Sequence, residues 1–183
     1  GEIVTAVLGA LSDKKRLRFR GGFMPEDVKD LVEKGVIVET CVTNTTGARS
    51  PGFYRWIHGN PQVEIKTMEY VHGIPQIAQT PGLTAIGSAL AVDLLGQVAS
   101  ETIGSAQISG IGGALDFARA SGMGSGKSII ALSSTYGKSA ASKIVPLFQK
   151  GDAVSLTRHD VDYVVTEYGI AELKHRSRRE RVR

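Results

Sequence analysis

The sequence predicts an α/β fold with an open, mostly parallel or mixed sheet flanked by helices. Three observations predict it. Short β-like runs alternate with helix-like runs along the chain, a pattern typical of α/β domains. The run Ile129–Ser133 is apolar, as in strands that are buried on both faces. The 183 residues are 42% hydrophobic and 22% charged, which is typical of a globular chain rather than a disordered one.

The first third of the chain predicts two helices and three strands. Apolar residues recur at helical spacing in Glu2–Leu11. The segment Pro25-Glu26-Asp27 is typical of a first helical turn, and Gly35 ends this second helix. The strands are expected at Arg16–Phe19, which Gly21-Gly22 closes, and at Val36–Val42 and Val63–Lys66. The long polar connection Thr43–Pro61 is a candidate functional loop, because long loops in compact domains are often functional.

The remaining elements continue the alternation. They are expected as a turn within Tyr70–Ile77, a strand over Leu83–Asp93, a turn at Leu95-Gly96-Gln97 leading to Val98-Ala99 and a helix over Ala114–Ala120. After these we expect the strand Ile129–Ser133, an edge element over Ser142–Phe148, a strand over Asp162–Val165 and a helix over Tyr168–Lys174. The sequence shows no internal repeat and no linker. We therefore expect one domain over residues 1–183.

The net charge of +4 comes from one end of the chain. Lys174–Arg183 holds six of the 22 basic residues and one of the 18 acidic residues, so the rest is close to neutral. No aromatic residues interleave with these cations. This pattern favours a solvated helix end over a nucleic-acid-binding arm, and no nucleic-acid partner is expected.

Composition also predicts the compartment. No apolar run approaches the roughly 20 residues that a membrane span needs, and the first residues lack a basic leader. The single cysteine, Cys41, excludes an internal disulfide and a cysteine-built metal site, and the four histidines show no ligand spacing. We expect a cytoplasmic protein with no metal and no membrane partner.

A glycine-rich turn is the most informative motif. Gly110, Gly112 and Gly113 lie in Ser109–Phe117, between a short β-like run and a helix-like run. Glycines here let backbone N–H groups approach a ligand, and a helix N-terminus favours negative charge. The turn can hold a phosphate or a developing oxyanion. The alternative is a tight strand-to-helix turn that simply needs glycine.

A second glycine-rich segment is a false motif. Ser121–Ser128 resembles a phosphate-binding P-loop, but it has serine where the pattern needs its first glycine. A helix precedes it and a strand follows it, the reverse of the required order. We interpret it as a helix-to-strand loop, so nucleotide hydrolysis is not expected.

Polar residues follow the buried strand. Ser133, Ser134, Thr135 and Lys138 come after its carboxyl end, where ligands bind in open α/β sheets. Lys138 is therefore a candidate phosphate contact, with simple solvation as the alternative.

Six phrases, in their order and spacing, carry a resemblance. They are "DLVEKGVI" at Asp30–Ile37, "LAVDLLGQV" at Leu90–Val98, "SGIGGALDF" at Ser109–Phe117, "IIALSST" at Ile129–Thr135, "SKIVP" at Ser142–Pro146 and "VVTEYGIAEL" at Val164–Leu173. Together they resemble the C-terminal domain of the acetyl-CoA hydrolase and 4-hydroxybutyrate CoA-transferase family (CoA-transferase family I). The resemblance implies a CoA-transferase (NagB/RpiA-like) type of fold. It also implies that the chain is the second of two related domains and lacks an N-terminal half.

The resemblance implies a chemistry as well. In this family a glutamate attacks a short-chain acyl-CoA, and a glutamyl-CoA thioester passes CoA to an acid of the acetate or 4-hydroxybutyrate type, or to water. The expected ligands are coenzyme A, as acyl-CoA, and small carboxylates, with no metal. A homo-oligomer is expected too. Gly110, Gly112 and Gly113 would stabilise the oxyanion, and Lys138 would contact CoA.

The sequence departs from the family at the nucleophile. Counting back from "DLVEKGVI" places the family's glutamate at Gly22, which has no side chain. Glu26 is the candidate substitute, with a first-turn carboxylate as its alternative role. Glu39 is a weaker candidate, and Glu167 is interpreted as a helix-start carboxylate. The alternative function is therefore a non-catalytic CoA-binding domain or a citrate-lyase α-type acyl transfer.

Overall fold

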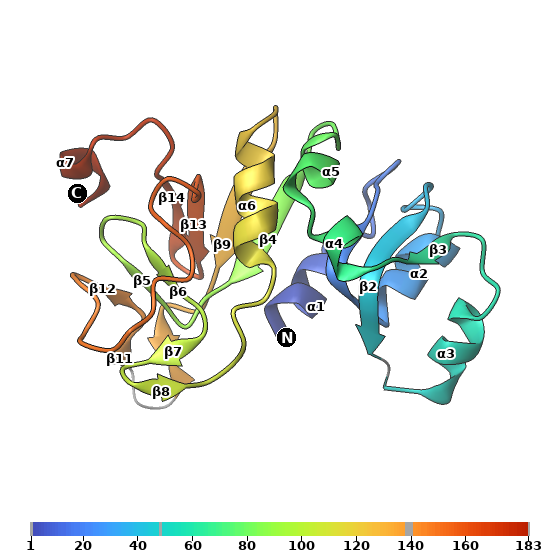
Figure 1. The fold of residues 1–183 in the computed structure, drawn as a ribbon, viewed down its shortest axis with the longest axis horizontal. Helices are drawn as coiled ribbons and strands as arrows, with labels where there is room; N and C mark the ends of the chain where they lie inside the picture. The colour runs from blue at the N-terminus through green and yellow to red at the C-terminus, as the bar shows by residue number, and fades with distance from the viewer. Residues whose placement is uncertain (1, 48, 138–140, 183) are drawn as a thin grey trace. The chain divides into compact units, whose positions relative to one another are not determined.

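The computed structural model describes residues 2–47, 49–137 and 141–182. They form a mixed α/β fold that divides into two compact units, Gly1–Gln76 and Ile77–Arg183 (Figure 1). Helix α5 (Ile74–Ala78) contains the residues where the first unit ends and the second begins. Within the described ranges, no helix has the length and apolar character that crossing a membrane requires.

The first unit is built on a small parallel sheet. Its strands lie in the order β1-β2-β3, with bounds β1 (Arg20–Pro25), β2 (Cys41–Gly47) and β3 (Val63–Ile65). The accompanying helices are α1 (Glu2–Gly9), α2 (Asp27–Glu33), α3 (Pro51–Ile57) and α4 (Met68–Val71). Helix α4 packs on β1 and β2.

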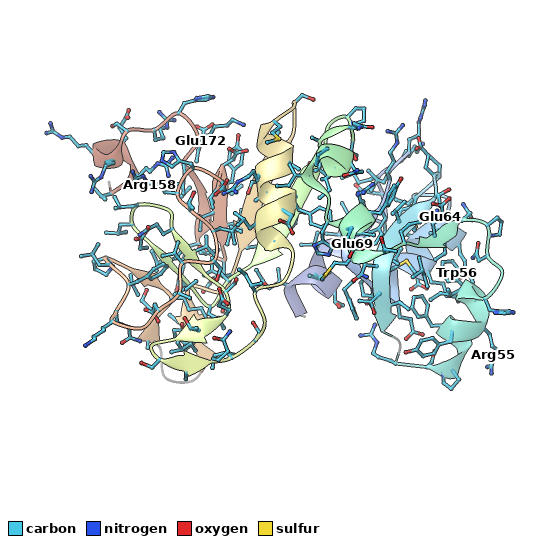
Figure 2. All side chains as sticks on the ribbon, in the orientation of Figure 1. Arg55, Trp56, Glu64, Glu69, Arg158 and Glu172 are labelled. Carbon is cyan, nitrogen blue, oxygen red and sulfur yellow. The ribbon has the colours of Figure 1, made fainter. Side chains whose placement is uncertain are left out.

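The core of this unit follows from the apolar stripe of α2. Val28 and Leu31 are buried there together with Met24 of β1 and Phe53 of α3. The ring of Trp56 stacks on that of Phe53, with centroids 5.7 Å apart. Figure 2 labels Trp56 on α3, together with Arg55, which projects away from the unit. Burial of these large side chains stabilises the unit.

Several predicted boundaries in the first unit are wrong. The strand predicted at Arg16–Phe19 begins at Arg20 instead, and Gly21-Gly22 lies inside it, because a parallel strand β2 pairs along these glycines. Before it, Leu17 makes only an isolated bridge to Ile37. The predicted strand Val36–Val42 lies later, as β2. The loop predicted over Thr43–Pro61 therefore contains most of β2 and all of α3.

Other predictions in this unit hold. The first two helices and the third strand are confirmed as α1, α2 and β3. Gly35 follows α2 with a φ of +68°, a left-handed conformation that glycine adopts without strain. The turn predicted within Tyr70–Ile77 lies at His72-Gly73, between the short helices α4 and α5.

The second unit is built on a four-stranded sheet in the order β14-β13-β9-β4. Its strands are β4 (Thr84–Ser88), β9 (Lys127–Ala131), β13 (Tyr163–Thr166) and β14 (Gly169–Glu172). The first three are parallel, and β14 is an antiparallel edge strand. Helix α6 (Ala114–Gly122) packs against β4 and β9 (Figure 1).

Smaller elements complete this unit. They are a three-stranded sheet in the order β12-β5-β6, made of β12 (Ile144–Val145), β5 (Ala91–Asp93) and β6 (Val98–Ala99); the pairs β7 (Thr102–Ile103) with β8 (Ala106–Gln107) and β10 (Thr135–Tyr136) with β11 (Ala141–Ser142); and α7 (Arg178–Arg181). The core contains Val92, Val98, Ile130 and Val164, from both sheets.

One strand prediction and one helix prediction in the second unit are wrong. The strand predicted over Leu83–Asp93 is two strands that belong to different sheets, β4 and β5. The helix predicted over Tyr168–Lys174 is the strand β14, because the chain turns back at Gly169 (φ +151°) and pairs with β13. The predicted helix Ala114–Ala120 is confirmed as α6.

Candidate functional site

The carboxyl ends of β4, β9 and β13 lie at one edge of the second unit's sheet, because these strands are parallel. Ser133 and Ser134 follow β9, and Glu167 follows β13. The parallel register pairs Ala131 with Val165, which brings the two following segments together. Ligands of open α/β sheets bind at this edge, so it is the candidate site.

A serine and a glutamate are joined at this edge. The hydroxyl of Ser134 donates to Oε1 of Glu167 at 2.6 Å, and the backbone N–H of Ser134 donates to Oε2 at 2.8 Å. The Ser134 hydroxyl, assisted by backbone N–H groups and by the charge of Lys143, lowers the pKa of Glu167. Glu167 is therefore an ionised carboxylate held between two strands, and its interpretation as a helix-start residue is wrong because β14 follows it.

A cation lies beside this pair. Nζ of Lys143 donates to Oγ of Ser133 at 2.9 Å and lies 5.1 Å from the centroid of the Tyr136 ring. The Tyr136 hydroxyl donates to the carbonyl of Leu90 at 2.7 Å, which fixes the ring. Lys143 is not among the residues that the sequence predicts to be functional. Its position in "SKIVP" was a signal of the family but carried no strand-end pattern.

The glycine-rich turn leads into the N-terminus of α6. A Cβ at Gly110 or at Gly112 would have no neighbour within 4 Å, and Gly112 has a φ of +62°. Gly113 is the N-cap and supplies no side-chain cap, so the turn's backbone leads into an open helix end. A Cβ at Gly87 would lie 3.8 Å from that of Ala114, which places the start of α6 beside the carboxyl end of β4.

The turn and Glu167 therefore share one edge of one sheet. Strand β9 lies between β4 and β13, so the two strand ends are about 10 Å apart. The sequence predicts a turn between a short strand and a helix, and in the structure this turn lies between β8 and α6. Open backbone N–H groups, an ionised carboxylate and an ammonium group are available there to a ligand.

A cavity of about 380 Å³ lies in the same unit. Thr166 and Tyr168, which flank Glu167 in the sequence, line it. Its other walls are mainly apolar: Val92, Leu94, Ile144, Val164, Ile170, Ala171 and Leu173, with Asp93, Gly169 and Arg181. Such a volume is sufficient for a small ligand with an apolar part.

Glu26 belongs to the first unit. Its Oε1 accepts from the hydroxyl of Ser50 at 2.6 Å, and its Oε2 accepts from the backbone N–H of Arg49 at 2.9 Å. These bonds lower the pKa of Glu26, the Ser50 hydroxyl most of all. Glu26 is also the N-cap residue of α2, and its side chain holds the segment that leads into α3.

Gly22, where the resemblance predicts the family's glutamate, is closely packed. A Cβ there would lie 2.5 Å from Nε2 of His72. The guanidinium of Arg20 holds the end of α4 near β1, donating to the carbonyl of Tyr70 at 2.6 Å and to that of Val71 at 3.4 Å. A side chain at position 22 therefore requires the imidazole of His72 to move.

Two further residues named in the sequence analysis are Lys138 and Cys41. Lys138 lies outside the described residues. Cys41 is fully buried, and burial raises the pKa of its thiol to about 11, which makes it unreactive. Among the residues that the structure describes, no group of three or more His, Cys, Asp or Glu side chains could hold a metal ion.

Comparison with known proteins identifies relatives along the whole chain. Residues 50–183 match the family described as the acetyl-CoA hydrolase/transferase C-terminal domain. A 4-hydroxybutyrate coenzyme A transferase of Clostridium kluyveri is 41% identical over 100% of this chain, which spans 44% of that protein. The crystal structure of RipA from Yersinia pestis superposes with a TM-score of 0.89 at 30% identity, over 100% of this chain and 43% of RipA. A 4-hydroxybutyrate CoA-transferase of Porphyromonas gingivalis gives a TM-score of 0.84 at 30% identity, over 100% and 44%.

Proposed function

Because the chain belongs to the acetyl-CoA hydrolase/transferase C-terminal domain family, we propose that its complete protein transfers CoA from a short-chain acyl-CoA to a carboxylic acid, or hydrolyses the acyl-CoA. The chain spans about 44% of the curated relative described above, so the activity is proposed for the complete protein, and an N-terminal half is part of this proposal. Acetate and 4-hydroxybutyrate are the proposed acids. We propose that the complete protein is a homo-oligomer and acts in the reducing cytoplasm.

One observation carries the proposal. An open glycine turn at the start of α6 and an ionised carboxylate, Glu167, lie at the same carboxyl edge of a parallel sheet. Backbone N–H groups of Gly110, Gly112 and Gly113 are the proposed donors to the oxyanion that forms when a thioester carbonyl is attacked. Lys138 is the proposed contact for CoA.

The proposed reaction divides into balanced steps. A carboxylate oxygen of the protein bonds to the thioester carbon, and the C–S bond breaks to release CoA thiolate and leave a mixed anhydride. The thiolate then attacks the protein's carbonyl carbon, giving a glutamyl-CoA thioester and the free acid. A second carboxylate repeats these steps in reverse, whereas water that resolves the intermediate gives hydrolysis.

Two glutamates are proposed as the nucleophile. Glu26 is the sequence candidate, and its lowered pKa keeps it ionised, although Arg49 and Ser50 occupy both of its oxygens. Glu167 is the structural candidate, because it lies at the same edge as the glycine turn. Either carboxylate must exchange its present hydrogen bonds for a bond to the acyl carbon.

Borohydride trapping in the complete protein tests the proposal. The protein is first incubated with acetyl-CoA, which forms the glutamyl-CoA thioester. Borohydride then reduces this thioester, and mass spectrometry locates the altered peptide. A modified Glu26 or Glu167 supports the transferase mechanism, and the corresponding Glu→Gln variant serves as its control. CoA binding without an adduct or turnover would favour the alternative, a non-catalytic CoA-binding domain or a citrate-lyase type of transfer.

A further inference from the structure

Lys143 is a cation with unused capacity. Its ammonium group has three donors, and with the described residues it forms one hydrogen bond, to the neutral hydroxyl of Ser133. Among the residues that the structure describes, no Asp or Glu oxygen forms an ion pair with Nζ. Lys174, in the same unit, by contrast forms an ion pair with Asp162, with Nζ 3.2 Å from Oδ2. Within the part of the chain that the structure describes, two donors of Lys143 are therefore left for a ligand.

Both the backbone and the ammonium group of Lys143 are held by neighbouring groups. The backbone N–H of Lys143 donates to the carbonyl of Ser134 at 2.7 Å, and its carbonyl accepts from the N–H of Val92 at 2.9 Å. The face of the Tyr136 ring lies 5.1 Å from Nζ, a favourable cation–π arrangement. A group positioned in this way loses little conformational entropy when it binds an anion.

The neighbouring charge explains why a cation is needed at this edge. Glu167 is ionised, and its pKa is lowered in part by the charge of Lys143. A second anionic group entering the edge would be repelled by Glu167 unless a cation compensated it. Nζ of Lys143 lies on the Ser133 side, while Glu167 is held by the adjacent Ser134. The arrangement thus separates a place for an incoming anion from the resident carboxylate.

We propose that Lys143 binds an anionic oxygen group of the substrate at the carboxyl edge, namely the carboxylate of the acid that accepts CoA. This inference rests on the proposed function. A phosphate of CoA offers the same chemistry to an ammonium group, so the two sources must be distinguished by experiment. Ser133, which accepts from Nζ, orients the ammonium group and has no direct role in the chemistry.

The test compares three variants of the complete protein. Lys143→Met removes the charge and keeps the length, Lys143→Arg keeps the charge, and Lys127→Met removes an exposed lysine at the first residue of β9, the opposite end of that strand. We expect Lys143→Met to raise the KM for acetate at least about tenfold, because hydrogen bonds to charged groups contribute this much to binding. The KM for acyl-CoA should stay unchanged, Lys143→Arg should restore most of the affinity, and Lys127→Met should match the wild type.

Binding measurements separate this inference from the proposed function. Acetate, CoA and pantetheine, which lacks the phosphates, are titrated into each variant by calorimetry. Loss of acetate binding in Lys143→Met supports the inference even if the wild type shows no turnover, a result that would sink only the proposed function. A loss confined to CoA, with pantetheine unaffected, assigns Lys143 to a phosphate and overturns the carboxylate assignment. Equal binding by Lys143→Met and wild type, or no binding of either ligand by the wild type, overturns it entirely.

Discussion

Gly112 offers a direct test of the glycine turn. Its φ of +62° lies in the left-handed region, and a Cβ there would meet no atom within 4 Å. Gly112→Ala therefore adds backbone strain without a steric clash. Gly122, the last residue of α6, is a matched control, because a Cβ there also has no neighbour within 4 Å and its φ is not in that region. The two variants add the same methyl group at opposite ends of one helix.

The structure sets the size of the effect. An L-residue in the left-handed region costs about 1–2 kcal/mol. If the turn keeps its conformation, this cost lowers the Tm by roughly 2–8 °C for a chain of this length. If the turn relaxes instead, the same free energy lowers the population of the open turn, and activity falls about 5- to 30-fold. Alanine at Gly122 should be neutral or stabilising, by up to about 1 kcal/mol.

Two assays on the same samples resolve this. Thermal unfolding followed by circular dichroism gives the Tm, and release of free CoA thiol from acetyl-CoA gives the rate in the complete protein. We expect Gly112→Ala to lose stability, activity or both, and Gly122→Ala to lose neither. If Gly112→Ala matches Gly122→Ala in both assays, the turn does not need its left-handed residue and the oxyanion proposal loses its geometric basis.

Three further predictions concern the carboxylate, the packed glycine and the thiol. Glu167→Gln should lower the Tm more at pH 7 than at pH 3. The folded-state pKa of Glu167 lies below the ordinary 4.5, so the ionised group stabilises the fold above pH 4.5, and this stabilisation disappears as the pH falls through the folded-state pKa. An equal loss of Tm at both pH values would contradict this prediction. Gly22→Glu should lower the free energy of unfolding by about 1–3 kcal/mol, and adding His72→Ala should relieve that loss. Urea unfolding of the wild type, the two single variants and the double variant measures this, and simple addition of the two effects would contradict it. Cys41, with its pKa near 11, should resist iodoacetamide at pH 8 until the chain is unfolded, and rapid alkylation of the native protein, seen by mass spectrometry, would mean that the thiol is accessible.

The sequence predicts elements best where one local signal dominates. The apolar stripe of α2 and the left-handed glycine after it define that helix without reference to the rest of the fold. The segment Tyr168–Lys174 has no such signal, and it becomes a strand only because β13 is available to pair with it. Similarly, Leu83–Asp93 looks continuous, but its two halves pair with different partners, β9 and β12.

The candidate site divides in the same way. The glycine turn is visible in the sequence because its left-handed position, Gly112, favours glycine. The partnership of Ser134 with Glu167 depends on the register of β9 and β13, which joins residues 33 positions apart in the chain. Lys143 reaches Ser133 through the pairing of β10 with β11 and of β12 with β5. No spacing rule predicts those contacts.

Gly22 shows how a departure from a family pattern can be built into the packing. The imidazole of His72 lies where a side chain at position 22 would begin, and Arg20 holds the segment that carries His72. Restoring a glutamate alone would therefore place two side chains in one space. A glutamate at position 22 therefore requires the imidazole of His72 to move, which couples these two positions. For this reason the nucleophile is sought at other carboxylates, and the trapping experiment is designed to distinguish them.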